Sequence, residues 1–293
     1  MGKGPREDVP PWGGRWLSRI VRASAGLALA SVTGCSLISP PAVHPPAAAP
    51  SVVGVYSPML PAPTRVRGVC IDPSSSTVPD FADSVRGLLA DTVANWGPAP
   101  PATTVTTALD PRPGLQLQLR TVATNSYGTQ NPHTTVSIQA VPGLAARPDV
   151  QDPGFSQEDP VWGKSRDEVV AGAQVADQEA RQGAEAIRVH PLDTSQSSEI
   201  AGCVSALAQT LPEGPRRLLL ASDLEQNEPP QVGGDLADTR VLVIQPCAGD
   251  AARCAALRDQ WERELTARGA PEVRFVRPEQ ALTELPAFLR EEP

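Results

Sequence analysis

Short apolar runs alternate with amphipathic segments through most of the chain after residue 64. Mainly apolar runs occupy 66–71, 217–221 and 240–245, and 272–276 forms a further short strand candidate. Between and after them lie segments with helical periodicity, at 78–96, 165–189, 199–211, 251–268 and 278–290. Continuous apolar strands that alternate with helices are typical of a parallel sheet with helices on both faces.

Two further segments predict an antiparallel hairpin within this sheet. Residues 115–122 alternate so that Leu115, Leu117 and Leu119 face one way, and 134–141 places Val136 and Ile138 on one side. The turn-rich stretch 125–132 joins them, and a short connection favours antiparallel pairing. An irregular loop is expected over 142–163. The sequence thus predicts a doubly wound α/β domain, mostly parallel, with one antiparallel edge hairpin.

The first 34 residues have the features of a secretory signal peptide. Arg15, Arg19 and Arg22 precede an apolar run at 23–32 that is too short to span a bilayer. The run ends Val32-Thr33-Gly34-Cys35, which resembles the bacterial lipobox. That resemblance implies cleavage before Cys35 and acylation of Cys35, for example with palmitate. The alternative is an ordinary signal peptide followed by an incidental cysteine.

The segment that follows is rich in proline and alanine and is expected to be a spacer. The expected organisation is a signal peptide at 1–34, a lipidated cysteine and linker at 35–64, and one domain at 65–293. The expected location is the extracytoplasmic face of the cell membrane, through a lipid anchor.

The charge balance argues against nucleic acid as a partner. The whole chain has a net charge of −8. Removal of 1–34 leaves 20 basic and 31 acidic residues, a net charge of −11. Proteins that bind nucleic acid need a basic face, and a domain of this charge is also not suited to lie on anionic lipid.

Four cysteines remain in the expected domain, and an exported chain can oxidise them. Cys247 and Cys254 lie close together in sequence and are the preferred disulfide. Cys70, in a core strand, and Cys203, in a helix, either pair or stay buried as thiols. Sequence spacing alone does not fix the pairing.

Oxygen-bearing side chains follow the ends of two predicted strands and open one helix. Asp72, Ser74 and Ser76 come after the first strand, and Asp223 comes after the strand at 217–221. Ser198 opens the helix at 199–211, with Thr194 nearby. Ligands of doubly wound sheets bind at the carboxyl ends of the strands. Hard oxygens in such a place suit a small divalent cation, Mg²⁺ or else Mn²⁺ or Ca²⁺.

This arrangement resembles the von Willebrand factor A (vWA) domain and its metal-ion-dependent adhesion site. The run Asp72-Pro73-Ser74-Ser75-Ser76 matches the D-x-S-x-S element of that family, and Asp223 matches the aspartate after its fourth strand. Where the family has a threonine, this chain has Ser198, or else Thr194. The resemblance implies that Ser74, Ser76 and the loop hydroxyl hold the metal directly, that Asp72 and Asp223 act through waters, and that a partner's carboxylate completes the shell.

Each of these residues also has an ordinary structural explanation. Ser74 or Ser76 could be the N-cap of the helix expected near residue 78, and Ser198 the N-cap of the next helix. Asp223 could be a solvated loop acid.

Three functions follow from these observations. The first is a protein or peptide binder that uses a divalent cation. The second is an interaction scaffold of the same fold with a degenerate, metal-free site. The third, a metal-dependent envelope hydrolase, ranks last because the sequence has no G-x-S-x-G elbow and no P-loop. We therefore do not expect an enzyme.

Overall fold

A computed structural model describes residues 59–73, 80–98, 108–123, 126, 131–146, 160–192, 198–226, 228–247 and 249–291. All of them belong to one compact unit, Val55–Pro293. The expected signal peptide and the lipidation of Cys35 lie outside the described residues and stay predictions. In the described part of the chain, no helix combines the length and hydrophobicity needed to span a bilayer.

A six-stranded sheet with the strand order β4-β3-β2-β6-β7-β8 forms the centre of the domain. The pairs β2–β3, β2–β6, β6–β7 and β7–β8 are parallel, and β3–β4 is antiparallel. The doubly wound α/β fold with one antiparallel hairpin is therefore confirmed. The strands are β2 (Thr64–Ile71), β3 (Gly114–Thr121), β4 (His133–Ile138), β6 (Arg216–Ala221), β7 (Thr239–Ile244) and β8 (Glu272–Val276).

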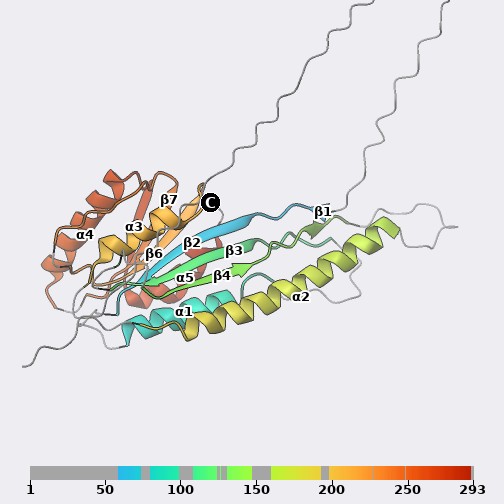
Figure 1. The fold of residues 1–293 in the computed structure, drawn as a ribbon, viewed down its shortest axis with the longest axis horizontal. Coiled ribbons are helices and arrows are strands. Elements are labelled where there is room, and N and C mark those ends of the chain that lie inside the picture. Colours follow the sequence, from blue (N-terminus) through green and yellow to red (C-terminus); the bar gives the residue numbers. More distant parts are fainter. Residues whose placement is uncertain are drawn as a thin grey trace, which may run out of the picture. The chain divides into compact units, whose positions relative to one another are not determined.

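Helices cover both faces of this sheet (Figure 1). One face packs against α1 (Phe81–Ala94), α2 (Pro160–Arg188) and α5 (Pro278–Arg290), and the other packs against α3 (Ile200–Thr210) and α4 (Ala251–Ala267). Each face of the sheet forms a hydrophobic core with the helices that cover it, and side chains of β6 alternate between the two cores. Leu219 belongs to the first core, while Leu218 and Leu220 belong to the second.

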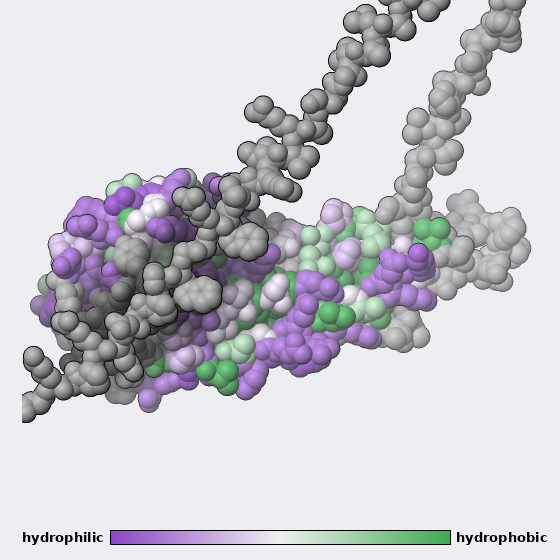
Figure 2. Space-filling model, in the orientation of Figure 1, coloured by the Kyte–Doolittle hydropathy of each residue, from purple (hydrophilic) through white to green (hydrophobic). Residues whose placement is uncertain are grey.

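Helix α2 approaches the sheet through a stripe of small residues. Ala176, Ala180 and Ala184 recur at helical spacing and are fully buried. A Cβ atom at Gly183 would collide with Cγ1 of Val136 on β4, so this close approach requires glycine. The outer surface along α2 is mostly hydrophilic, with isolated hydrophobic residues (Figure 2).

A buried arginine fixes the end of α5 to the central strand β2. Arg67 is fully buried, and its Nε donates to the carbonyl oxygen of Leu289 at 2.9 Å. Its Nη2 donates to the carbonyl oxygen of Glu291 at 3.1 Å. A guanidinium at this place satisfies carbonyl groups that a helix leaves open at its C-terminus.

Two details differ from the expectation. A small antiparallel sheet joins β1 (Met59–Leu60) to β5 (Gly143–Leu144), and β1 lies within the range assigned to the linker. Helix α2 begins at Pro160, inside the expected irregular loop. Trp162 is thus a helical residue, and its indole N–H donates to the carbonyl oxygen of Ala145 at 3.0 Å.

Candidate functional site at the carboxyl edge of the sheet

Asp72 lies where the chain leaves β2, next to the end of β6. Its backbone N–H donates to the carbonyl oxygen of Ala221 at 2.8 Å, which continues the ladder between these strands by one residue. On one side of these two strands the sheet continues to β3 and β4, and on the other to β7 and β8. This is the point at which the strand order changes direction, where doubly wound sheets bind their ligands.

The Asp72 carboxylate is fully buried and accepts a hydrogen bond on each oxygen. The Ser198 hydroxyl donates to Oδ1 at 3.0 Å, and the Ser222 hydroxyl donates to Oδ2 at 2.8 Å. A buried carboxylate needs such donors, since burial without them is costly. Three segments that are far apart in the sequence are therefore joined at this one side chain.

The turn after β6 is fixed by hydrogen bonds of its own. The Ser222 hydroxyl accepts from the backbone N–H of Leu224 at 2.9 Å. Leu224 has a φ of 68°, in the left-handed region that side chains rarely adopt. Its carbonyl oxygen accepts from the indole N–H of Trp261 at 3.2 Å, so the α4 side of the domain holds this conformation in place.

Asp223 is buried in the same turn, with 7 % of its surface exposed. Burial raises the pKa of its carboxyl to about 6, and the negative charges of Asp72 and Glu225 act in the same direction. The backbone N–H of Glu225, which donates to Oδ1 at 3.0 Å, and the positive charge of Arg253 oppose the shift in pKa. Asp223 and Asp72 thus form a pair of neighbouring acids.

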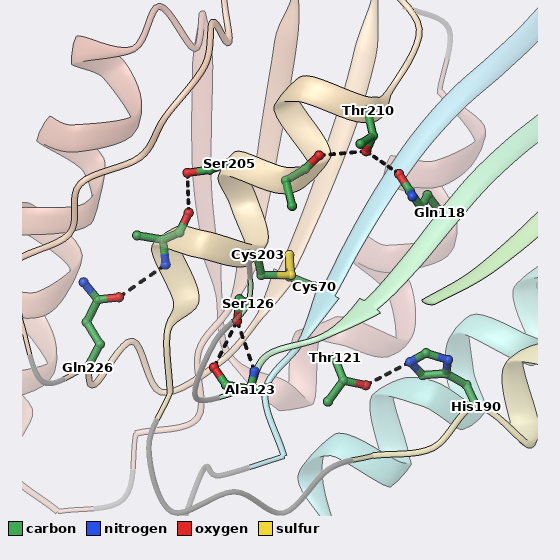
Figure 3. The surroundings of a disulfide bond; sticks show 12 residues. Cys70, Gln118, Thr121, Ala123, Ser126, His190, Cys203, Ser205, Thr210 and Gln226 are labelled. Carbon is green, nitrogen blue, oxygen red and sulfur yellow. Dashed lines mark hydrogen bonds between the residues drawn. A yellow bond between two sulfur atoms is a disulfide. The ribbon is translucent and has the colours of Figure 1, made fainter. Parts of the chain in front are cut away.

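The start of α3 is held against the loop that follows β3. Glu199 donates its backbone N–H to the carbonyl oxygen of Ala123 at 3.1 Å, and its side chain accepts from the N–H of Ser126 at 2.7 Å. Figure 3 shows Ser126 turned toward Ala123 below the Cys70–Cys203 disulfide. The disulfide joins β2 to α3, so the strand that directly precedes Asp72 and the helix that follows Ser198 are covalently linked.

All four cysteines of the domain form disulfide bonds. Cys247 and Cys254 form the expected disulfide. Cys70 and Cys203, whose state the sequence left open, form the second. The pairing of Cys70 with Cys203 spans 133 positions, which no spacing rule could have indicated.

The structure also decides some of the capping alternatives. Helix α1 begins at Phe81 with Asp80 as its N-cap, so neither Ser74 nor Ser76 has that role. The N-cap of α3 is Glu199, not Ser198. Asp223 is buried, and the interpretation as a solvated loop acid is wrong. Ser74, Ser76 and Thr194 lie outside the described residues.

The expectation of a metal-binding protein with a magnesium site needs correction. Among the residues that the structure describes, no group of three or more His, Cys, Asp or Glu side chains could hold a metal ion. The described part of this edge brings together only two carboxyl groups, Asp72 and Asp223, and both oxygens of Asp72 accept hydrogen bonds from the hydroxyls of Ser198 and Ser222. Ser198, one of the expected metal ligands, donates a hydrogen bond to this carboxylate.

Two polar groups near this edge were not anticipated. Gln245, at the end of β7, is fully buried and donates from Nε2 to the carbonyl oxygen of Asp223 at 3.3 Å. His190, after α2, bonds the hydroxyls of Thr121 and Thr134 (the Thr121 contact appears in Figure 3). A polar residue directly after an apolar strand was the available signal for Gln245, whereas His190 depends on tertiary contacts alone.

Comparisons with known proteins give little further guidance. No model of a known protein family matches the chain, and no curated protein matches it. Solved structures that match include proximal thread matrix protein 1 from the mussel byssus, with a TM-score of 0.40 and 10 % identity. Another is the human COPII-coat protein Sec24c, with a TM-score of 0.35 and 11 % identity. Each match covers 79 % of this chain, but only 48 % of the mussel chain and 33 % of Sec24c.

Proposed function

We propose that the domain is the interaction module of an exported protein, and that it holds a protein partner at the carboxyl edge of its sheet without a bound metal. The observation that carries this proposal is the buried Asp72 carboxylate, which accepts hydrogen bonds from Ser198 and Ser222. An edge assembled from three segments and stabilised internally can present a fixed surface and needs no cation for its assembly.

The order of the strands and the meeting of Asp72, Ser198 and Asp223 support a vWA-like domain whose adhesion site has become degenerate. Two disulfides support an oxidising, extracytoplasmic compartment. The acidic net charge of the chain gives no support to nucleic acid as the partner.

The absence of a metal requirement is tested by thermal unfolding. We expect the same midpoint in EDTA and in millimolar Mg²⁺, Mn²⁺ or Ca²⁺, because both oxygens of the Asp72 carboxylate already accept hydrogen bonds from hydroxyl groups. A ligand that binds only the folded state at a hundred times its Kd would stabilise the domain by about 2.7 kcal/mol. A metal-dependent rise in the midpoint that Ser198→Ala abolishes would contradict the proposal.

Partner binding at this edge is tested by site-specific photocrosslinking in the native envelope. A photoreactive residue at the exposed Glu228, in the loop after β6, should crosslink to a protein in the presence of EDTA. The matched control is the exposed Gln182 on α2, on the other side of the sheet. Crosslinks of equal yield from both positions, or from neither, would refute an interaction at the carboxyl edge.

A further inference from the structure

A half-open pocket lies beside the candidate site, at the same edge of the sheet. Its volume is about 460 Å³, within the range of small ligand sites. The loop after β7 and the first turns of α4 and α5 enclose it. The lining includes Gln245, the disulfide Cys247–Cys254, Arg258 and Arg277.

One of the two arginines is positioned through the candidate site itself. Arg258, on α4, donates from Nε to Oε1 of Gln245. Gln245 in turn donates from its amide to the carbonyl oxygen of Asp223. The guanidinium is therefore anchored by its Nε, with its direction set by a fully buried glutamine. This chain of hydrogen bonds links the pocket to the turn after β6.

The pocket is positively charged within an acidic chain. Arg258 and Arg277 contribute two positive charges, and Glu279 is the one carboxylate among the described lining residues. None of the ion pairs among the described residues includes Arg258 or Arg277. Arg277 is exposed and directly precedes α5, whose N-terminus adds a partial positive charge.

We propose that this pocket receives a carboxylate from an acidic segment of the protein partner. Each guanidinium offers a planar set of N–H donors that suits a carboxylate, and the two positive charges in the lining favour a negatively charged group. The volume admits one or two side chains and leaves the rest of a partner outside. This inference rests on the proposed function, since it names the chemistry of the partner that the same edge would hold.

The test uses the intact protein and a fluorescein-labelled tetra-aspartate peptide, followed by fluorescence anisotropy. We expect saturable binding that weakens as salt is raised, because exposed charges are screened. Arg277→Glu should weaken binding at least about tenfold, the loss that corresponds to one charge-assisted hydrogen bond. Glu279→Gln should strengthen binding, because it removes the negative charge from the lining.

The matched control for Arg277→Glu is Arg263→Glu, which makes the same charge change at an exposed position on α4 outside the pocket. Equal losses in the two variants would show only the effect of net charge and would overturn the proposal. No binding to the wild-type protein would overturn it as well.

A second arm separates a carboxylate site from a phosphate site. Inorganic phosphate is titrated against the peptide complex. If phosphate displaces the peptide only at concentrations where sodium chloride of the same ionic strength displaces it equally, the result supports a carboxylate pocket. Tight phosphate binding without peptide binding overturns it. Failure here would leave the crosslinks from Glu228 unaffected, and so it can be distinguished from failure of the proposed function.

Discussion

The Ser198 hydroxyl donates a hydrogen bond to Oδ1 of Asp72 at 3.0 Å, across 126 positions of sequence. Ser198 is half-buried and Asp72 is fully buried, so little water is available to replace this bond. A hydrogen bond to a charged group contributes more than one between neutral groups. This hydrogen bond therefore joins the start of α3 to the end of β2. The Cys70–Cys203 disulfide joins the same strand and helix covalently.

Ser198→Ala should lower the free energy of unfolding by about 1–3 kcal/mol, because it removes one donor to a buried carboxylate. Urea denaturation monitored by circular dichroism measures this loss. Ser137→Ala is the matched control, since Ser137 is exposed on β4, and its effect should stay within about 0.5 kcal/mol. Equal effects of the two substitutions would show that the Ser198–Asp72 bond does not stabilise the domain.

The sequence was sufficient for the sheet because hydrophobic periodicity is a local property. The run at 217–221 became β6, and the two alternating segments became the β3–β4 hairpin with Leu117 opposite Val136. The small β1–β5 sheet was missed because two-residue strands carry no periodicity. Trp162 was assigned to a loop, but α2 begins at Pro160, and the hydrogen bond from Trp162 to Ala145 is a tertiary contact that the sequence does not reveal.

The candidate site was only partly predictable for a related reason. Strand ends placed Asp72 and Asp223 at one edge of the sheet, because parallel strands end together. The same positions are compatible with a cation or with direct hydroxyl–carboxylate bonds. The difference lies in side-chain geometry, such as the hydrogen bond from Ser198 to Asp72, which the sequence does not give. The hydrogen bonds of His190 to Thr121 and Thr134, and the pocket that contains Arg258 and Arg277, likewise depend on packing between distant elements.

The two disulfides should differ in their contribution to stability. In the chain-entropy account, Cys70–Cys203, with a separation of 133, contributes about 5 kcal/mol, and Cys247–Cys254, with a separation of 7, about 2 kcal/mol. Cys70→Ala with Cys203→Ala should therefore destabilise the domain more than Cys247→Ala with Cys254→Ala. Urea denaturation of both double variants checks the order. The reverse order would show that the stabilisation by these disulfides comes mainly from packing in the native state and not from restriction of the unfolded chain.

Asp223→Asn should stabilise the domain at neutral pH. The pKa of Asp223 is raised to about 6, so its stabilising contribution is complete below its unfolded value of 3.8 and is lost as pH rises through about 6. At pH 7 the variant avoids a buried charge and should gain up to about 3 kcal/mol. Its amide oxygen can still accept from the Glu225 N–H. Asp259→Asn, at an exposed position on α4, is the control and should leave the pH profile unchanged.

His190 should produce the opposite dependence on pH. Burial, followed by the positive charges of Arg86 and His133, lowers its pKa to about 4. Its stabilising contribution is therefore complete above 6.5 and is lost as pH falls through about 4. Protonation adds a charge at a buried ring whose two nitrogens bond Thr121 and Thr134. Between pH 4 and 6 the effects of His190 and Asp223 on the free energy of unfolding have opposite signs. Together they therefore add little to the dependence of wild-type stability on pH.

The two variants should expose these opposed slopes. Asp223→Asn leaves the His190 effect, so its stability should fall as the solution is acidified from pH 6.5 to 4. His190→Gln leaves the Asp223 effect, so its stability should rise over the same interval, from a lower value at pH 7 because its contacts with Thr121 and Thr134 are disturbed. Urea midpoints measured at half-unit steps of pH give both slopes. Slopes of the same sign in the two variants would contradict the assignment, because two groups with oppositely shifted pKa values cannot both bind protons on folding.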